Sequence, residues 1–234
     1  MSESPGVRRT AIDVAAAELS SLSPQDSAAA RRLDAEAMAD LGMPSILLME
    51  NAARAVADEA RRLLGGGDVL VLAGKGNNGG DGLAMARFLS PHVRVALVDE
   101  PTTADAALQL AMLRAAHIPV HVAADAERLT ELADRADVIV DALIGTGLWS
   151  PPRGAVADWI RWANDAAQSV VAVDLPSGLS ADTGEAFDPC IRAGVTVTFA
   201  RPKLGLLERD GPAHAGRVVV ATLGLPEDWV EGRD

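Results

Sequence analysis

Seven short apolar runs, rich in β-branched residues, recur between residue 69 and residue 223. Most of them are continuously apolar rather than alternating in polarity, which is typical of strands buried on both faces of a sheet. We expect strands at 69–73, 93–98, 118–122, 138–143, 170–175, 195–199 and 218–223. Helical segments at about 80–90, 103–116, 125–135 and 154–167 separate the first five. This alternation predicts an α/β fold, with a mostly parallel sheet covered by helices on both sides.

The ends of the chain add further expectations. Only loops separate the last two strands, so we expect this pair to be antiparallel. One helix should start at Ser23-Pro24 and stop near Leu41, and a second should run from Pro44-Ser45 to the glycines at 65–67. Residues 1–22 are expected to form a poorly ordered lead-in. The remaining 23–234 should form a single domain.

Composition excludes several functional classes. The chain has 33 acidic and 21 basic residues, a formal charge of −12, and therefore lacks the basic surface that nucleic acids or anionic lipids require. Its one cysteine, Cys190, excludes an internal disulfide and a cysteine-based zinc site. No apolar run approaches the roughly 18 residues of a membrane span, and no signal peptide is recognisable. We expect a cytoplasmic protein with no nucleic-acid or membrane partner.

A glycine-rich segment follows the first predicted strand, at the edge where parallel sheets bind ligands. Gly74, Gly76 and Gly79 form a G-x-G-x-x-G pattern, and Asp99 lies about 25 residues beyond, near the position of a ribose-binding acid. Alone, this pattern favours an NAD-dependent oxidoreductase. Its loop can present backbone N–H groups to a phosphate or sugar.

Two features of the same loop weaken the oxidoreductase interpretation. Asp81 falls in the first turn of the following helix, where its charge would repel a pyrophosphate. Asn77 and Asn78 place two carboxamides where dehydrogenase loops leave room for phosphate. We therefore expect the loop to serve a different ligand chemistry.

Two carboxylates, Asp141 and Asp174, each end a buried apolar run. A carboxylate there is costly unless it is paired, hydrogen-bonded or bound to a cation, although either residue could instead cap a helix. Ser177 follows in a sharp turn near the same sheet edge. Asn78, Asp141 and Ser177 offer only oxygen atoms, the ligands of hard cations. One carboxylate among neutral oxygens suits a monovalent ion at least as well as magnesium.

Five stretches of the chain carry a family resemblance. They are LLMENAA (47–53), GNNGGDG (76–82), VDALIGTGL (140–148), VDLPSG (173–178) and Thr198-Phe199 followed by Pro202-Lys203. Together they resemble the NAD(P)H-hydrate epimerase family from about residue 25 to 225. The resemblance implies a Rossmann-like three-layer α-β-α sandwich with a mostly parallel central sheet. It also implies a potassium-dependent epimerase that interconverts the R and S hydrates of NADH or NADPH.

The resemblance also implies a set of site residues. Carried over to this chain, Asn78, Asp141 and Ser177 would hold K⁺. The implied substrate contacts are Asn77, Asn78, Gly79, Gly80, Asp81, Gly145, Thr146, Gly147, Leu148, Trp149, Ser150, Pro151 and Asp174. The Pro-rich stretch 149–153 departs from the family pattern, although Trp149 could cover a ring. The family further implies a homodimer and, because many members carry a dehydratase domain, a separate dehydratase partner.

The chemistry of the hydrate suggests roles for two carboxylates. Its hydroxyl lies on a ring carbon next to nitrogen, so the nitrogen can expel hydroxide and leave a planar cation that water attacks from either face. An acid must protonate the departing hydroxyl, and a base must activate the returning water. We expect Asp174 to fill both catalytic roles, with Asp81 as the reserve base.

Two other functions remain open at this point. An NAD-dependent oxidoreductase would bind intact NADH and reduce a second substrate. A non-catalytic protein-binding scaffold of the same fold would have no need to bury Asp141 and Asp174. Among the remaining candidates, the four histidines lack a common ligand spacing, and Lys203 is better placed than Lys75 to reach a phosphate. Asn51 either faces the pocket or binds backbone at a helix.

Overall fold

The computed structural model describes residues 11–13 and 22–233. Its middle layer is an eight-stranded sheet in the order β1-β8-β7-β6-β5-β2-β3-β4. The strands are β1 (Ala11–Asp13), β2 (Asp68–Ala73), β3 (Val93–Leu97), β4 (Val120–Val122), β5 (Ala136–Ala142), β6 (Ser169–Val173), β7 (Val195–Phe199) and β8 (Arg217–Ala221). Strands β2 to β8 pair in parallel, and β1 pairs antiparallel with β8. The predicted mostly parallel sheet is thereby confirmed.

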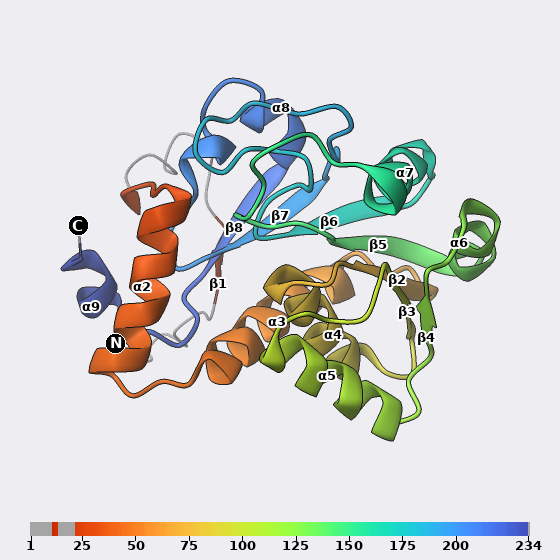
Figure 1. Cartoon of the computed structure of the whole chain (residues 1–234), viewed down its shortest axis with the longest axis horizontal. Helices are drawn as coiled ribbons and strands as arrows, with labels where there is room; N and C mark the ends of the chain where they lie inside the picture. Colours follow the sequence, from red (N-terminus) through yellow and green to blue (C-terminus); the bar gives the residue numbers. More distant parts are fainter. Residues whose placement is uncertain (1–10, 14–21, 234) are drawn as a thin grey trace, which may run out of the picture.

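Helices form the outer two layers (Figure 1). One face carries α3 (Ser45–Arg62), α4 (Asn77–Leu89) and α5 (Ala104–Ala115), and the other carries α6 (Ala126–Ala133) and α7 (Gly154–Asp165). Two further helices, α2 (Ser27–Asp40) and α9 (Glu227–Glu231), pack together near the end of β8. The α-β-α sandwich agrees with the expected fold class.

The central strands are apolar because both of their faces are covered. In β2, Val71 and Ala73 join the core beneath α3–α5, whereas Leu70 and Leu72 join the core beneath α6 and α7. All six residues of this strand are buried. The continuous apolar pattern in the sequence therefore reflects burial from two sides.

The last two strands correct one prediction. β7 and β8 are parallel, not antiparallel, with Val195 opposite Arg217. The connection contains a short 3₁₀ helix, η2 (Leu204–Leu206), and α8 (Gly211–Ala215), which together carry the chain back to the starting end of the sheet. Short helices hidden among glycine and proline gave the sequence pattern of a loop.

The N-terminal region differs from expectation in two ways. α2 begins at Ser27, not near Ser23, because the Asp26 side chain accepts a hydrogen bond from the Ala29 N–H at 2.6 Å and caps the helix. Most of the predicted lead-in at 1–22 lies outside the described residues. Its described part includes β1, a strand that the sequence did not predict.

Candidate active site

The carboxyl ends of the parallel strands meet at one rim of the sheet, and there Asp141 and Ser177 form a compact unit. Asp141 is the penultimate residue of β5, and Ser177 lies in the turn after β6. The Ser177 hydroxyl donates to Asp141 Oδ1 at 2.6 Å, and its backbone N–H donates to Oδ2 at 2.7 Å. The Leu143 N–H also donates to Oδ1, at 3.2 Å. We call this unit the Asp141–Ser177 corner.

Burial dominates the electrostatics of this corner. Both side chains are fully buried. Burial raises the pKa of Asp141 to about 6, although the hydrogen bonds from Ser177 and Leu143 act in the opposite direction. Asp141 lies within a strand and caps no helix, so the capping alternative is wrong for this residue. The site contains a costly charge that hydrogen bonds only partly stabilise.

Asn78 reaches the same corner through the turn after β5. The Ile144 N–H donates to Ser177 Oγ at 2.8 Å, and the Ile144 carbonyl oxygen lies 3.1 Å from that Oγ. The next residue is Gly145, where a Cβ would lie 3.0 Å from Asn78 Oδ1. The structure therefore brings Asn78, Asp141 and Ser177 around one turn.

The amide of Asn78 has an unusual environment. Its Nδ2 is buried and has no hydrogen-bond partner within the described part of the chain. An amide N–H in this position can donate to an acceptor, such as an oxygen of a ligand, but not to a cation. The Oδ1 of the same amide, with the oxygens of Asp141, Ser177 and Ile144, gives a set of neutral and anionic oxygens that suits an alkali cation.

Close backbone approach shapes the glycine-rich loop. A Cβ at Gly79 would lie 1.8 Å from the Gly74 carbonyl oxygen, so only glycine permits this first turn of α4. A Cβ at Gly80 would lie 2.6 Å from the end of the Met49 side chain. The motif thus fits the loop and α4 tightly against α3, with Asn77 exposed at its tip.

Asp174 occupies a second corner of the rim, with Lys203. The Lys203 ammonium lies 2.7 Å from Asp174 Oδ1, 3.0 Å from the Phe199 carbonyl oxygen and 3.3 Å from Thr198 Oγ1. Lys203 is 3% exposed. Its three N–H donors thus have three acceptors, and it is not free to bind the phosphate that the sequence suggested. We call this unit the Asp174–Lys203 corner.

The backbone of Asp174 is itself unusual. Its φ is +66°, in the left-handed region that aspartate tolerates better than most residues. The residue's N–H donates to the Val197 carbonyl at 2.7 Å, and Thr198 Oγ1 donates to Asp174 Oδ1 at 3.2 Å. Neighbouring β7 thus holds this strained position and directs the carboxylate towards Lys203.

Two more carboxylates act electrostatically on this corner. Burial raises the pKa of Asp81 well above its usual value, and the charges of Asp174 and Asp34 raise it further against the opposing effect of Lys203. The pKa of Asp34, on α2, is also raised by burial, then lowered by Lys203 and raised by Asp174. The sequence did not identify Asp34, because one acidic residue on an amphipathic helix resembles a solvated one.

The predicted substrate loop lies partly open. Gly145 is buried, Thr146 and Leu148 are half-buried, and Gly147, Trp149, Ser150 and Pro151 are exposed. The Trp149 ring is 69% exposed, and the Arg31 guanidinium of α2 lies 6.0 Å from its centre. The loop is therefore joined to the Asp141–Ser177 corner at its start and reaches α2 at its end.

The contacts of Asn51 and the burial of Cys190 define the roles of two lesser candidates. Asn51 Nδ2 donates to the Leu223 carbonyl at 2.7 Å and so has a structural role between α3 and the loop after β8. Burial raises the pKa of Cys190 to about 12, which fits an unreactive thiol. Within residues 11–13 and 22–233, His, Cys, Asp and Glu form no group of three or more able to hold a metal. Across that same part of the chain, no helix is both long and apolar enough to cross a bilayer.

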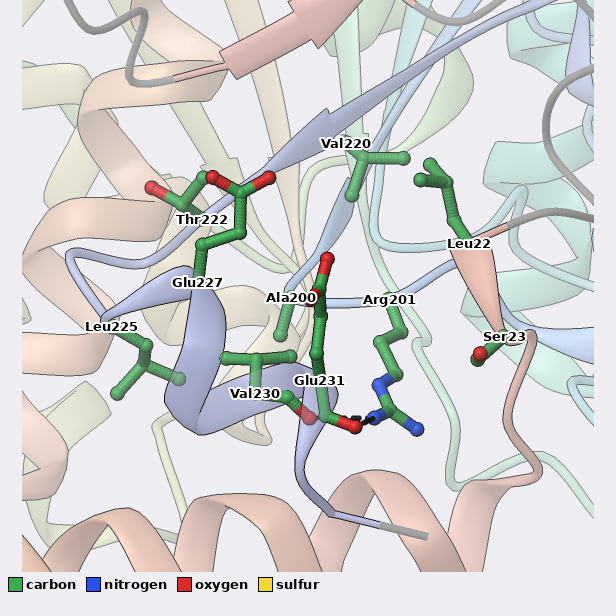
Figure 2. A pocket seen from close by; sticks show the side chains of 10 residues that line it. All are labelled: Leu22, Ser23, Ala200, Arg201, Val220, Thr222, Leu225, Glu227, Val230 and Glu231. Carbon is green, nitrogen blue, oxygen red and sulfur yellow. Dashed lines mark hydrogen bonds between the residues drawn. The ribbon is translucent and has the colours of Figure 1, made fainter.

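A cavity of about 280 Å³ lies beyond the ends of β7 and β8 (Figure 2). Ala200, Arg201, Thr222 and Val230 line it, and Arg201 donates to the Val230 carbonyl. No residue of the two corners lines this cavity. It is a separate feature of the same rim and adds nothing to the predicted site.

Comparison with known proteins places this rim in context. The family model described as "YjeF-related protein N-terminus" matches residues 45–205. A crystal structure of yeast ynu0 superimposes with a TM-score of 0.73 at 27% identity, covering 85% of this chain and 87% of the yeast chain.

Curated relatives agree with that match. An NAD(P)H-hydrate epimerase of Rhodopirellula baltica is 37% identical, covering 97% of this chain and 94% of the relative. One from Limosilactobacillus reuteri is 42% identical, covering 82% and 91%. A bifunctional NAD(P)H-hydrate repair enzyme of Moorella thermoacetica is 41% identical, covering 85% of this chain but 40% of the longer relative. The chain belongs to the NAD(P)H-hydrate epimerase family of enzymes.

Proposed function

We propose that this chain interconverts the R and S forms of hydrated NADH or NADPH. The convergence at one rim of the glycine-rich loop and two unlike carboxylate corners supports this function. The Asp141–Ser177 corner offers oxygens to an ion, and the Asp174–Lys203 corner offers a carboxylate for proton transfer. Family membership supplies the substrate class.

A potassium ion fits the donor set of the Asp141–Ser177 corner. Asn78, Asp141 and Ser177 would hold the ion through their oxygen atoms, and Asn78 Oδ1 lies beside the Gly145 turn that follows Asp141. The ion would supply charge that stabilises the buried Asp141 carboxylate and fixes the turn at Ile144 and Gly145. It would thereby set the position of the loop that is proposed to contact the substrate.

In the simplest mechanism, Asp174 carries out both proton transfers. The carboxyl group would protonate the departing hydroxyl, and the resulting carboxylate would accept a proton from the returning water. The ring nitrogen supplies and recovers the electron pair, so the reaction needs no redox step and no covalent intermediate. Water returning on the opposite face gives the other epimer.

The test is conversion of one purified hydrate epimer into the other, followed by chromatography in buffers containing either potassium or sodium. We expect faster conversion in potassium. Addition of carbonyl substrates to NADH should leave its absorbance unchanged, whereas an oxidoreductase would consume it. If the folded protein does not accelerate interconversion in either salt, the proposed function is wrong.

A second repair activity would complete the pathway. The Moorella thermoacetica relative contains a region like this chain within a longer bifunctional repair enzyme. We propose that a separate dehydratase consumes one epimer supplied by this chain. The homodimer and the cytoplasmic location stay predictions.

A further inference from the structure

Asp174 and Asp81 have different electrostatic environments at the Asp174–Lys203 corner. Lys203 lies 2.7 Å from Asp174, whereas no ion pair reaches Asp81 within the described residues. A lysine in direct contact favours the ionised form of a carboxyl, and a neighbouring negative charge favours the protonated form. The geometry therefore gives the two carboxyls opposite tendencies.

The position of Asp81 on α4 brings it to the same region from another element. Because α4 begins at Asn77, Asp81 lies in its second turn and not in the first turn that the sequence predicted. A Cβ at the next residue, Gly82, would lie 2.5 Å from the Ala142 Cβ, so this turn of α4 rests on the end of β5. β5 lies between β2, which leads into α4, and β6, which ends at Asp174. Asp81 thus comes from the helix layer, and Asp174 comes from the strand end.

The local charge balance favours a retained proton on Asp81. Asp174 is in direct contact with the Lys203 ammonium, whereas Asp34 from α2 and Asp81 from α4 feel the same charge from farther away. Asp34 is exposed and Asp81 is half-buried, whereas Asp174 and Lys203 are buried as a pair. Ionisation of Asp81 would therefore add a negative charge beside an ion pair that is already neutral, which is unfavourable. The raised pKa of Asp81 is consistent with that proton residing there.

We propose that Asp81 and Asp174 divide the proton transfer, Asp81 donating on one face of the nicotinamide ring and Asp174 accepting on the other, with Lys203 as the positioning residue that keeps these roles apart. This inference rests on the proposed epimerase function and replaces its single-carboxyl form. Sites with two carboxyls of unlike environment commonly separate acid from base in this way.

The reaction balances as follows. Asp81 gives its proton to the hydroxyl, the carbon–oxygen bond breaks, water departs, and the nitrogen lone pair forms a carbon–nitrogen double bond. A second water attacks that carbon from the opposite face, Asp174 takes its proton, and the double-bond electron pair returns to nitrogen. The net change is inversion at one carbon and a proton moved from Asp81 to Asp174. Exchange with solvent restores the starting state.

Oxygen exchange distinguishes the two mechanisms. Each epimer is incubated separately in ¹⁸O-labelled water with wild-type, Asp81→Asn, Asp174→Asn or the surface control Asp158→Asn, and the uncatalysed rate is subtracted. For one epimer, we expect Asp174→Asn to lose inversion by about 10²–10⁴-fold yet still exchange its hydroxyl oxygen with retention. Asp81→Asn should lose both exchange and inversion of that epimer. Asp158, 73% exposed on α7, should behave as wild type.

The opposite pattern would overturn the inference. If Asp174→Asn loses exchange of both epimers while Asp81→Asn keeps inversion, a single carboxyl acts alone. If the wild-type protein itself fails to invert either epimer, the proposed function fails instead. The two failures are therefore distinguishable in one experiment.

Lys203→Met tests the positioning residue through the pH profile. Loss of the ammonium should shift the acidic limb of the inversion rate towards higher pH, because a positive charge in contact with a carboxylate has been removed. Thr198→Val removes a hydrogen bond to Asp174 and an acceptor of Lys203 but no charge, and should shift the limb much less than Lys203→Met. An unmoved limb in Lys203→Met that unfolds cooperatively would contradict the role of Lys203. If that variant does not fold, the oxygen-exchange pattern still decides the inference.

Discussion

Asp141 and Asp174 end neighbouring strands of one sheet, yet the protein stabilises the two carboxylates differently. Asp141 is fully buried and receives hydrogen bonds from Ser177 and Leu143. Asp174 is 8% exposed and lies against Lys203. The negative charge of Asp174 is compensated by Lys203. Asp141 receives hydrogen bonds only, so its negative charge is the one that a bound cation would compensate. The contrast supports the proposal that proton transfer and ion binding belong to different corners.

The largest expected effect comes from Asp174→Asn. Loss of the carboxylate should lower the inversion rate by about 10²–10⁴-fold, because an amide cannot accept the proton of the attacking water. The rate is measured by chromatography of the two epimers, with the folded fraction checked by thermal unfolding. Wild-type inversion by a folded Asp174→Asn would end the assignment of Asp174.

The second prediction concerns Asp141 and the pH dependence of the free energy of unfolding. The pKa of Asp141 is about 6 when folded, against 3.8 ordinarily, so the folded chain holds this proton more tightly than the unfolded chain. In sodium buffer, its contribution to stability should be present below pH 4 and lost as the pH rises through about 6. The difference corresponds to roughly 3 kcal/mol.

Potassium should offset that loss. Urea unfolding in potassium and in sodium should give a clear difference at pH 7.5 and little difference at pH 4.5, where the folded chain keeps Asp141 protonated and the ion has no carboxylate to bind. An equal effect of the two salts at both pH values would argue against an ion at the Asp141–Ser177 corner.

Ser177→Ala should have a smaller effect on stability. It removes the hydroxyl that donates to Asp141 and accepts from Ile144, and keeps the backbone donor. We expect a loss of about 1–2 kcal/mol in the free energy of unfolding, together with the potassium response. Ser150→Ala, at an exposed loop position, serves as the matched control. Retention of the potassium response would remove Ser177 from the ion site.

Trp149→Ala should have the smallest effect on folding. Its ring is 69% exposed, so the free energy of unfolding should change by less than about 0.5 kcal/mol. If the ring covers the substrate, as proposed, KM should rise while kcat stays near the wild-type value. An unchanged KM would place Trp149 outside the binding surface.

Sequence reasoning worked where the chemistry is local or follows from strand order. Continuous apolar runs identified the seven parallel strands, because burial on both faces leaves that pattern. Asp141 and Ser177 could be placed together because parallel strands end at one rim. Gly79 was recognisable, since its close approach to Gly74 is the usual reason for that motif.

The missed contacts depend on how distant segments dock. Lys203 meets Asp174 across 29 residues of chain. Asp34 comes near the same corner because α2 docks there, through backbone hydrogen bonds of Gln25 to Pro202 and Leu204 and through hydrogen bonds of Ser27 to Asp182. Neither arrangement leaves a periodic signal. The parallel β7–β8 pair was hidden likewise, by short helices in the connection.

Because Lys203 is buried, the rate of its chemical labelling measures how often this part of the rim opens to solvent. The chain contains two lysines, and the other, Lys75, is exposed at the glycine-rich loop. An amine-selective reagent should label Lys75 at once, but reach Lys203 only when its surroundings open. Mass spectrometry of the labelled peptides would then give the rate at which this region opens, without any dye, tag or mutation.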